Sequence, residues 1–109
     1  MKRVSVNAEL IEDWDSFHHQ FSRIFGFPDF YGANMDAWIN CMSYLDDWVS
    51  GMTKVWINKG DTLIIELNNT DEFKNKYQDI YSSLLQCIDI VNLRNIEANK
   101  KTKIVLTNT

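Results

Sequence analysis

Acidic side chains gather without basic ones in one part of the sequence. Residues 24–53 include no lysine or arginine but hold four acids: Asp29, Asp36, Asp46 and Asp47. Within this part, polar residues recur at spacings of four, three and four positions: Asp36, Asn40, Ser43 and Asp47. Residues with this spacing share one face of a helix. We expect the face to attract a basic partner, in particular one whose site is built to hold phosphates.

The charge of the chain is unevenly distributed. The formal net charge is −4. Residues 1–50 carry eight acids and three bases, a charge of −5, whereas residues 51–109 carry seven acids and eight bases, a charge of +1. This distribution gives no basic face for binding nucleic acid. An acidic surface that only aids solubility is the alternative explanation.

No pattern of residues predicts a metal site or an enzyme. His18 and His19 are adjacent, and Cys41 lies far from Cys87. The spacing of a zinc site is therefore absent. We expect both histidines on the solvent side of the first helix and Cys41 packed inertly in the second. The four glycines form no phosphate-binding loop, so no cofactor is expected, and a cysteine–histidine enzyme is the remote alternative.

An aromatic segment precedes the acidic face. The stretch "FPDFYGANMDAWINCM", residues 27–42, leads from a loop into a helix that Asn34 can cap. Phe30 and Tyr31 either pack under the loop or contact a partner. Asp36 either stabilises the helix dipole or contacts the same partner. The local pattern leaves both alternatives open.

Apolar periodicity predicts an α/β fold. Strands are expected at 3–7, 63–67 and 103–107, where β-branched and other apolar residues cluster. A first helix is expected to begin near Asp13 or Asp15 and to close at Gly26, since Pro28 prevents its continuation. The order of all elements is β-α-α-β-α-β. It predicts a three-stranded parallel sheet packed with helices, with the first strand in the middle and right-handed crossovers.

The remaining helices follow from the same periodicity. One face of the second helix holds four apolar residues: Met35, Ile39, Met42 and Val49. A third long helix is expected from a cap at Thr70 to about residue 97, and a short edge strand is possible at Val55 and Ile57. The length, with 45% hydrophobic residues, suits a single domain over residues 1–109. No leader-like opening and no apolar run of membrane length is present, so we expect a cytoplasmic protein with reduced thiols.

The segment 27–42 resembles the signature of the barstar family, the intracellular inhibitors of barnase-type ribonucleases. In that family a proline, an acid, two aromatics and a glycine precede Asn, an aliphatic residue, Asp and Ala. The matching residues here are Pro28, Asp29, Phe30, Tyr31, Gly32, Asn34, Met35, Asp36, Ala37 and Cys41. The order of strands and helices agrees along the whole chain.

The resemblance implies a function and a site. In the barstar family the loop and the start of the second helix plug the nuclease active site, and acidic side chains stand in for RNA phosphates. The chain is thus expected to be an inhibitor or immunity protein that blocks a ribonuclease with a basic active site, without catalysis, cofactor or metal, and without binding nucleic acid or membrane. The alternative is an interaction module or an immunity protein against another kind of partner. The partner-binding residues implied are Phe30, Tyr31, Gly32, Asn34, Met35, Asp36, Ile39, Asn40, Ser43, Tyr44 and Asp47.

Several positions depart from the family pattern. Neutral Asn40 stands where the strongest acidic contact falls, Phe30 lacks the hydroxyl of a contacting tyrosine, and Ile39 replaces a contacting tryptophan. Asp89 is only a loose counterpart for a contributing glutamate. Residues 46–60 are additional in this chain. We therefore expect a divergent partner, and Asp36 to matter more for binding than Asn40.

Overall fold

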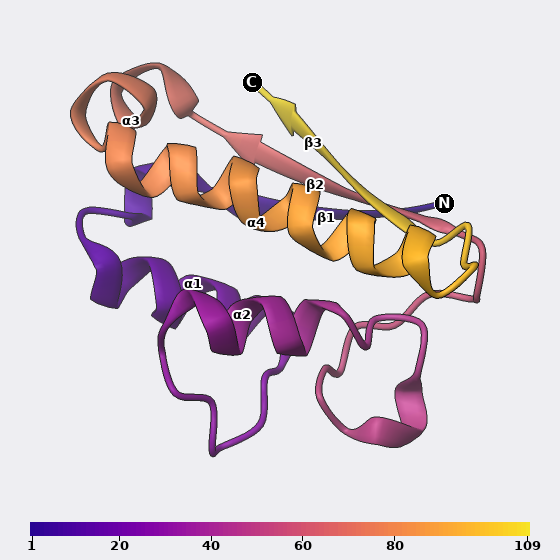
Figure 1. Ribbon diagram of the computed structural model, residues 1–109. Coiled ribbons are helices and arrows are strands. Elements are labelled where there is room, and N and C mark those ends of the chain that lie inside the picture. Colours follow the sequence, from indigo (N-terminus) through magenta and orange to yellow (C-terminus); the bar gives the residue numbers. More distant parts are fainter.

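The computed structural model describes residues 1–109 and contains three strands, four helices and two short 3-10 helices, η1 and η2. Their bounds in chain order are β1 Lys2–Asn7, η1 Ala8–Leu10, α1 Trp14–Phe25, α2 Met35–Met42, η2 Trp48–Ser50, β2 Thr62–Asn68, α3 Thr70–Lys76, α4 Gln78–Glu97 and β3 Lys103–Asn108. In Figure 1, α4 crosses in front of the strands, and α1 and α2 lie together below it.

The three strands are parallel, as predicted, but their order is β1-β2-β3, so β2 is central. The prediction that the first strand is in the middle is wrong. The physical reason is burial: β2 has four buried residues, Leu63, Ile64, Ile65 and Leu67, whereas β1 and β3 have one each, and the most apolar strand suits the central place. Strands β1 and β3 begin with exposed Lys2 and Lys103, and lysine suits a sheet edge.

The helices cover the face of the sheet to which Leu63, Ile65 and Leu67 point, and together they form one buried core. The other face of the sheet carries polar side chains around Ile64 and Val105. There the Ser5 hydroxyl donates to Glu66 over 3.2 Å, and the Arg3 guanidinium lies 3.6 Å from the same carboxylate. Successive residues of a strand point to opposite faces, which explains the separation.

Helix α1 begins and ends where the sequence predicts. The Ser16 N–H donates to the Asp13 carboxylate over 2.7 Å, and the Asp13 N–H donates to the Ser16 hydroxyl over 3.0 Å, so the cap is reciprocal. Gly26 ends the helix with a φ of +67°, a conformation that favours glycine. His19 is exposed, but the expectation that His18 also faces solvent is wrong, because its side chain is buried against the loop that follows α1.

Helix α2 is shorter than expected. It ends at Met42, and the Ser43 hydroxyl donates back to the Ile39 carbonyl over 2.6 Å. Val49 therefore does not lie on its apolar face but is 75% exposed in η2. The prediction that Asp47 shares a helix face with Asp36 and Asn40 is wrong for the same reason, because Asp47 lies beyond the end of α2. The possible edge strand at 55–57 does not form: the segment is irregular and joins the rest of the chain through single backbone hydrogen bonds.

The third long helix is divided into α3 and α4 by a break at Tyr77. Its expected cap is also different, because Thr70 is the first helical residue and its hydroxyl donates to the Thr109 carbonyl over 3.1 Å. The apolar spacing of Phe73, Tyr77 and Ile80 continues through the break, so the sequence pattern contains no sign of it. None of the helices has both the length and the apolarity needed to span a membrane.

Candidate functional site

The acidic face begins at a fixed helix start. The Ala37 N–H donates to the Asn34 side-chain oxygen over 2.8 Å, and the Asn34 amide donates to the Gly32 carbonyl over 3.5 Å. This confirms the predicted cap and ties the loop to α2. Asp36, in the first turn of α2, and Asn40, one turn later, are both exposed. Their four-residue spacing places them on the same side of the helix.

The two aromatic residues of the loop point in different directions. Phe30 is 78% exposed. Tyr31 is half-buried, its ring lies 4.7 Å from that of Phe27, and its hydroxyl hydrogen-bonds His18 Nδ1 over 2.5 Å. Of the two alternatives for the pair, Tyr31 thus packs under the loop, whereas Phe30 is free to meet a partner.

The hydrogen bond between Tyr31 and His18 joins two neutral groups. Burial lowers the pKa of His18, and the negative charge of Asp15 opposes this only in part. Burial likewise raises the pKa of Tyr31 far above its usual range, with a smaller contribution from Cys41. Desolvation disfavours the charged form of either group. The contact therefore supports the loop without adding charge to the surface.

The residues predicted to bind a partner differ in accessibility. Ile39 is buried, at 6% exposure, and belongs to the core rather than to a contact surface. This follows from the packing of α2, in which Trp38, Cys41 and Met42 are buried with it. Three others are half-buried: Tyr31, Met35 and Ser43. Seven are exposed: Phe30, Gly32, Asn34, Asp36, Asn40, Tyr44 and Asp47.

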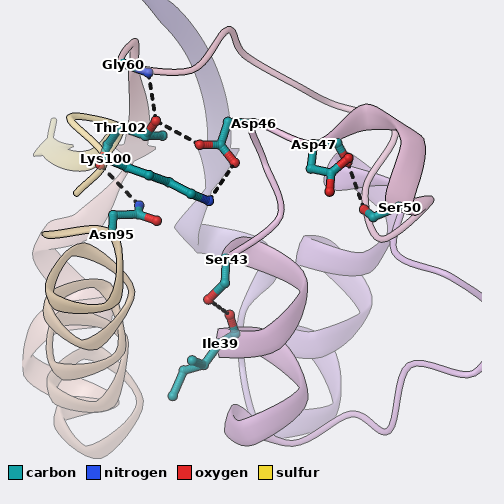
Figure 2. A network of polar contacts seen from close by, with 9 residues as sticks. All are labelled: Ile39, Ser43, Asp46, Asp47, Ser50, Gly60, Asn95, Lys100 and Thr102. Atoms are coloured by element: carbon teal, nitrogen blue, oxygen red, sulfur yellow. Dashed lines mark hydrogen bonds and ion pairs between the residues drawn. The ribbon is translucent and has the colours of Figure 1, made fainter. Parts of the chain in front are cut away.

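Two adjacent acids at the end of α2 have different surroundings, as Figure 2 shows. The Asp46 side chain is 1% exposed, and one of its oxygens lies 3.3 Å from the Lys100 ammonium. Its other oxygen accepts a hydrogen bond from the Thr102 hydroxyl over 2.8 Å. Asp47 is exposed. One of the four acids between residues 24 and 53 is thus internal, which leaves three for the surface.

A base from another helix reaches the acidic face. The Arg94 guanidinium of α4 donates to the Asn40 side-chain oxygen over 3.2 Å, and both side chains are exposed. The two residues are 54 positions apart, so this contact could not be predicted from the residues near Asn40 in the sequence. Asp89 is exposed on α4, but it lies about 140° around the helix from Arg94 at about 100° per residue, away from α2.

The remaining candidates for chemistry are internal. Cys41 and Cys87 are buried free thiols. Burial raises the pKa of both, with a smaller contribution from Asp36 at Cys87, so both remain protonated near neutral pH. The structure holds no group of three or more histidine, cysteine or acidic side chains arranged for a metal ion.

Comparison with protein families matches residues 1–107 to the family model described as Barstar (barnase inhibitor). The chain belongs to the barstar family. The match covers nearly the whole chain, and it confirms the resemblance noted in the segment 27–42. The parallel three-stranded sheet with its helices is consistent with the barstar family, whose members are inhibitors and not enzymes. No curated protein matches the sequence significantly.

Proposed function

We propose that this member of the barstar family binds a barnase-type ribonuclease and blocks its active site with α2 and the preceding loop. The observation that carries the proposal is the exposed Asp36 carboxylate, held at the capped start of α2, with the exposed Phe30 in the loop that precedes it. A carboxylate at this place can occupy a phosphate position among the basic groups of a nuclease. Inhibition then requires only occupancy of the site, with no covalent step.

The surface is prepared for binding before the partner arrives. The Asn34 cap fixes the direction of α2, and the contact between Tyr31 and His18 fixes the loop that carries Phe30. Side chains and loops that are already ordered lose less entropy on association. The ordered loop and helix thus lower the entropic cost of binding, which increases the affinity of the proposed inhibitor.

The contact between Asn40 and Arg94 bears on which ribonuclease is bound. At this position the chain offers an amide whose oxygen already accepts from a guanidinium. A conventional barnase-type enzyme that places a cation here would find no carboxylate to pair with it. We therefore propose that the natural partner is a divergent ribonuclease toxin of which this chain is the immunity protein, with Asp36 and Asp47 as the main acidic contacts.

The test is a titration of the chain against a panel of purified barnase-type ribonucleases, barnase included, with RNA cleavage as the readout. For an inhibited enzyme, Asp36→Ala should weaken binding by about tenfold or more, a loss typical of a residue central to an interface. The matched variant Asn40→Ala should change it by about twofold or less, as usual for a minor contact. If the two variants behave alike, Asp36 only supports the start of α2.

Charge should also govern the rate of association. Exposed carboxylates steer a basic partner, and salt screens them beyond about 8–10 Å near physiological ionic strength. The association rate constant with an inhibited ribonuclease should therefore fall as salt is raised, as stopped-flow fluorescence would show. A rate that stays the same from low to high salt contradicts steering by the acidic face.

The variant Asn40→Asp tests the partner class directly. It restores an acid at the position where the barstar family has its strongest contact, but Arg94 would pair with it inside the chain. Inhibition of barnase should improve with Asn40→Asp and improve further with Asn40→Asp combined with Arg94→Ala. Unchanged inhibition by both variants would speak against this part of α2 as a contact.

We also propose that inhibition takes place in the cytoplasm of the producing cell, a setting that the two free thiols suit. If the chain inhibits no ribonuclease of the panel, the alternative is a barstar-fold protein directed at another kind of partner. The neutral Asn40 and the missing hydroxyl at Phe30 are the observations that favour this alternative.

A further inference from the structure

Large apolar side chains are exposed in the segment between α2 and β2. Trp48 is 66% exposed, Val49 75% and Trp56 46%. A tryptophan in a folded domain usually buries most of its surface. Large exposed apolar side chains in one segment mark interaction surfaces more often than ordinary surface. We call these three residues the apolar insert.

The chain segment that carries the apolar insert is anchored at both of its ends. Asp46, just before it, is buried in its contacts with Lys100 and Thr102. Beyond it, the Gly60 N–H donates to the same Thr102 hydroxyl over 2.8 Å (Figure 2). One side-chain cluster thus closes the segment at both of its ends, and the tryptophans in between lie on a fixed base.

The middle of the segment is also attached to the two helices beside it. The Ile57 N–H donates to the Leu45 carbonyl over 2.8 Å, which brings the neighbour of Trp56 to the turn just after α2. The Lys54 N–H donates to the Phe25 carbonyl over 2.8 Å at the end of α1. At Gly26 the approach is so close that a Cβ atom would lie 2.6 Å from the Cβ of Lys54. The apolar insert is therefore presented without a large cost of ordering.

The apolar insert continues the acidic face without a gap in the chain. Tyr44 follows Asn40 by four residues and is 43% exposed, and Asp47 is exposed directly before Trp48. The Ser50 hydroxyl and N–H both donate to the Asp47 carbonyl, over 2.8 and 3.2 Å, and hold η2 against this acid. A partner that covers Asp47 thus also meets Trp48, the next residue in the chain.

We propose that Trp48, Val49 and Trp56 make a second, apolar contact with the same ribonuclease, on the wall beside its basic cleft. This inference rests on the proposed function and adds a determinant of partner choice to it. Asn40 is neutral and Asp46 is internal, so the acidic face is weaker than its sequence indicates. An apolar patch on the enzyme, matched to the two tryptophans, supplies the affinity that these acids do not. Tryptophan is the residue type most often central to an interface.

The experiment compares Trp48→Ala with Leu10→Ala, using the enzyme of the ribonuclease panel that the unmodified chain inhibits most tightly. Leu10 is a matched control because it is 49% exposed in the other 3-10 helix, at the carboxyl end of β1. Trp48→Ala should raise Kd by about tenfold or more, whereas Leu10→Ala should leave it within about twofold. Thermal unfolding of both variants checks that each is folded.

Kinetics and salt distinguish an apolar contact from the charged one. The loss in Trp48→Ala should be a faster dissociation with an unchanged association rate, and it should be equally large at low and high salt. The loss in Asp36→Ala should shrink as salt rises. A loss in Trp48→Ala that also shrinks with salt would contradict an apolar contact.

Three outcomes overturn the inference, and they can be told apart. If the enzyme is inhibited but Trp48→Ala changes Kd less than twofold, the apolar insert is not a contact and the proposed function stands. If the unmodified chain forms dimers in analytical ultracentrifugation that Trp48→Ala abolishes, the occupant is a second copy of the chain. If no ribonuclease of the panel is inhibited, the proposed function fails, and this inference fails with it.

Discussion

Two loops beside α1 and α2 are held in place by different chemistry. Both extend from the helices on the side away from α4 in Figure 1. The loop before α2 is held by aromatic packing and by the neutral hydrogen bond between Tyr31 and His18. The loop after α2 is held by the ion pair between Asp46 and Lys100, together with the hydroxyl of Thr102.

The comparison shows that a residue which anchors a loop is not free to contact a partner. Asp46 and Asp47 are neighbours and carry the same group, but the first fixes the loop and the second lies on the surface. Tyr31 and Phe30 divide the same two tasks in the other loop. In each loop, an inward residue holds an outward neighbour in position. The numbers of acids and aromatics in the sequence therefore overstate what a partner can contact.

The largest expected effect on stability comes from the loop after α2, which is held by the ion pair between Asp46 and Lys100. Asp46→Ala should lower the free energy of unfolding by about 2–4 kcal/mol, because it leaves Lys100 and the Thr102 hydroxyl without their partner. Lys100 is partly exposed, which keeps the loss below that of a fully buried pair. Asp47→Ala is the matched control and should stay within about 0.5 kcal/mol. Urea unfolding of both variants measures the difference, and equal losses would remove the distinction between the two acids.

Substitutions in the loop before α2, which is held by neutral contacts, should lower the free energy of unfolding less. Tyr31→Phe keeps the ring packing on Phe27 and removes only the hydrogen bond to His18, so it should cost about 1 kcal/mol in unfolding free energy. Phe30→Ala should cost less than about 0.5 kcal/mol, because its side chain is mostly exposed. The same urea experiment applies. A loss in Tyr31→Phe as large as that in Asp46→Ala would mean that the two loops are held equally strongly.

The smallest expected effect is a pH dependence that comes from the neutral loop. The pKa of His18 in the folded state lies below its ordinary value of 6.5, so below that pH the unfolded chain binds more protons than the folded one. The contribution of His18 is complete above pH 6.5 and is lost as the pH falls through the lowered folded value. His18→Gln should flatten the decline in stability below pH 6.5 in thermal unfolding. The exposed neighbour His19 supplies the matched control variant, His19→Gln. If stability declines below pH 6.5 in His18→Gln as it does in the unmodified chain, protonation of carboxylates causes the decline.

The local features of this protein could be predicted from its sequence. Asp13 and Asn34 cap their helices and Gly26 ends α1, because each acts on backbone groups within a few residues. The strand segments, their parallel arrangement and the signature segment 27–42 were also readable, since apolar periodicity and chain connectivity determine them. These were enough to indicate the fold class and the barstar family.

Only the tertiary structure decided which of the candidate residues are exposed and which are engaged inside the chain. Asp46 is withdrawn from the surface by Lys100, and Asn40 is engaged by Arg94, each pair being 54 positions apart in the sequence. The central place of β2 likewise depends on pairing with two distant strands. A local pattern specifies which side of a helix or strand is apolar, but not which distant side chain packs against it. That choice is made by the packing of whole elements, and here it separates the acids that anchor from those that remain free to bind.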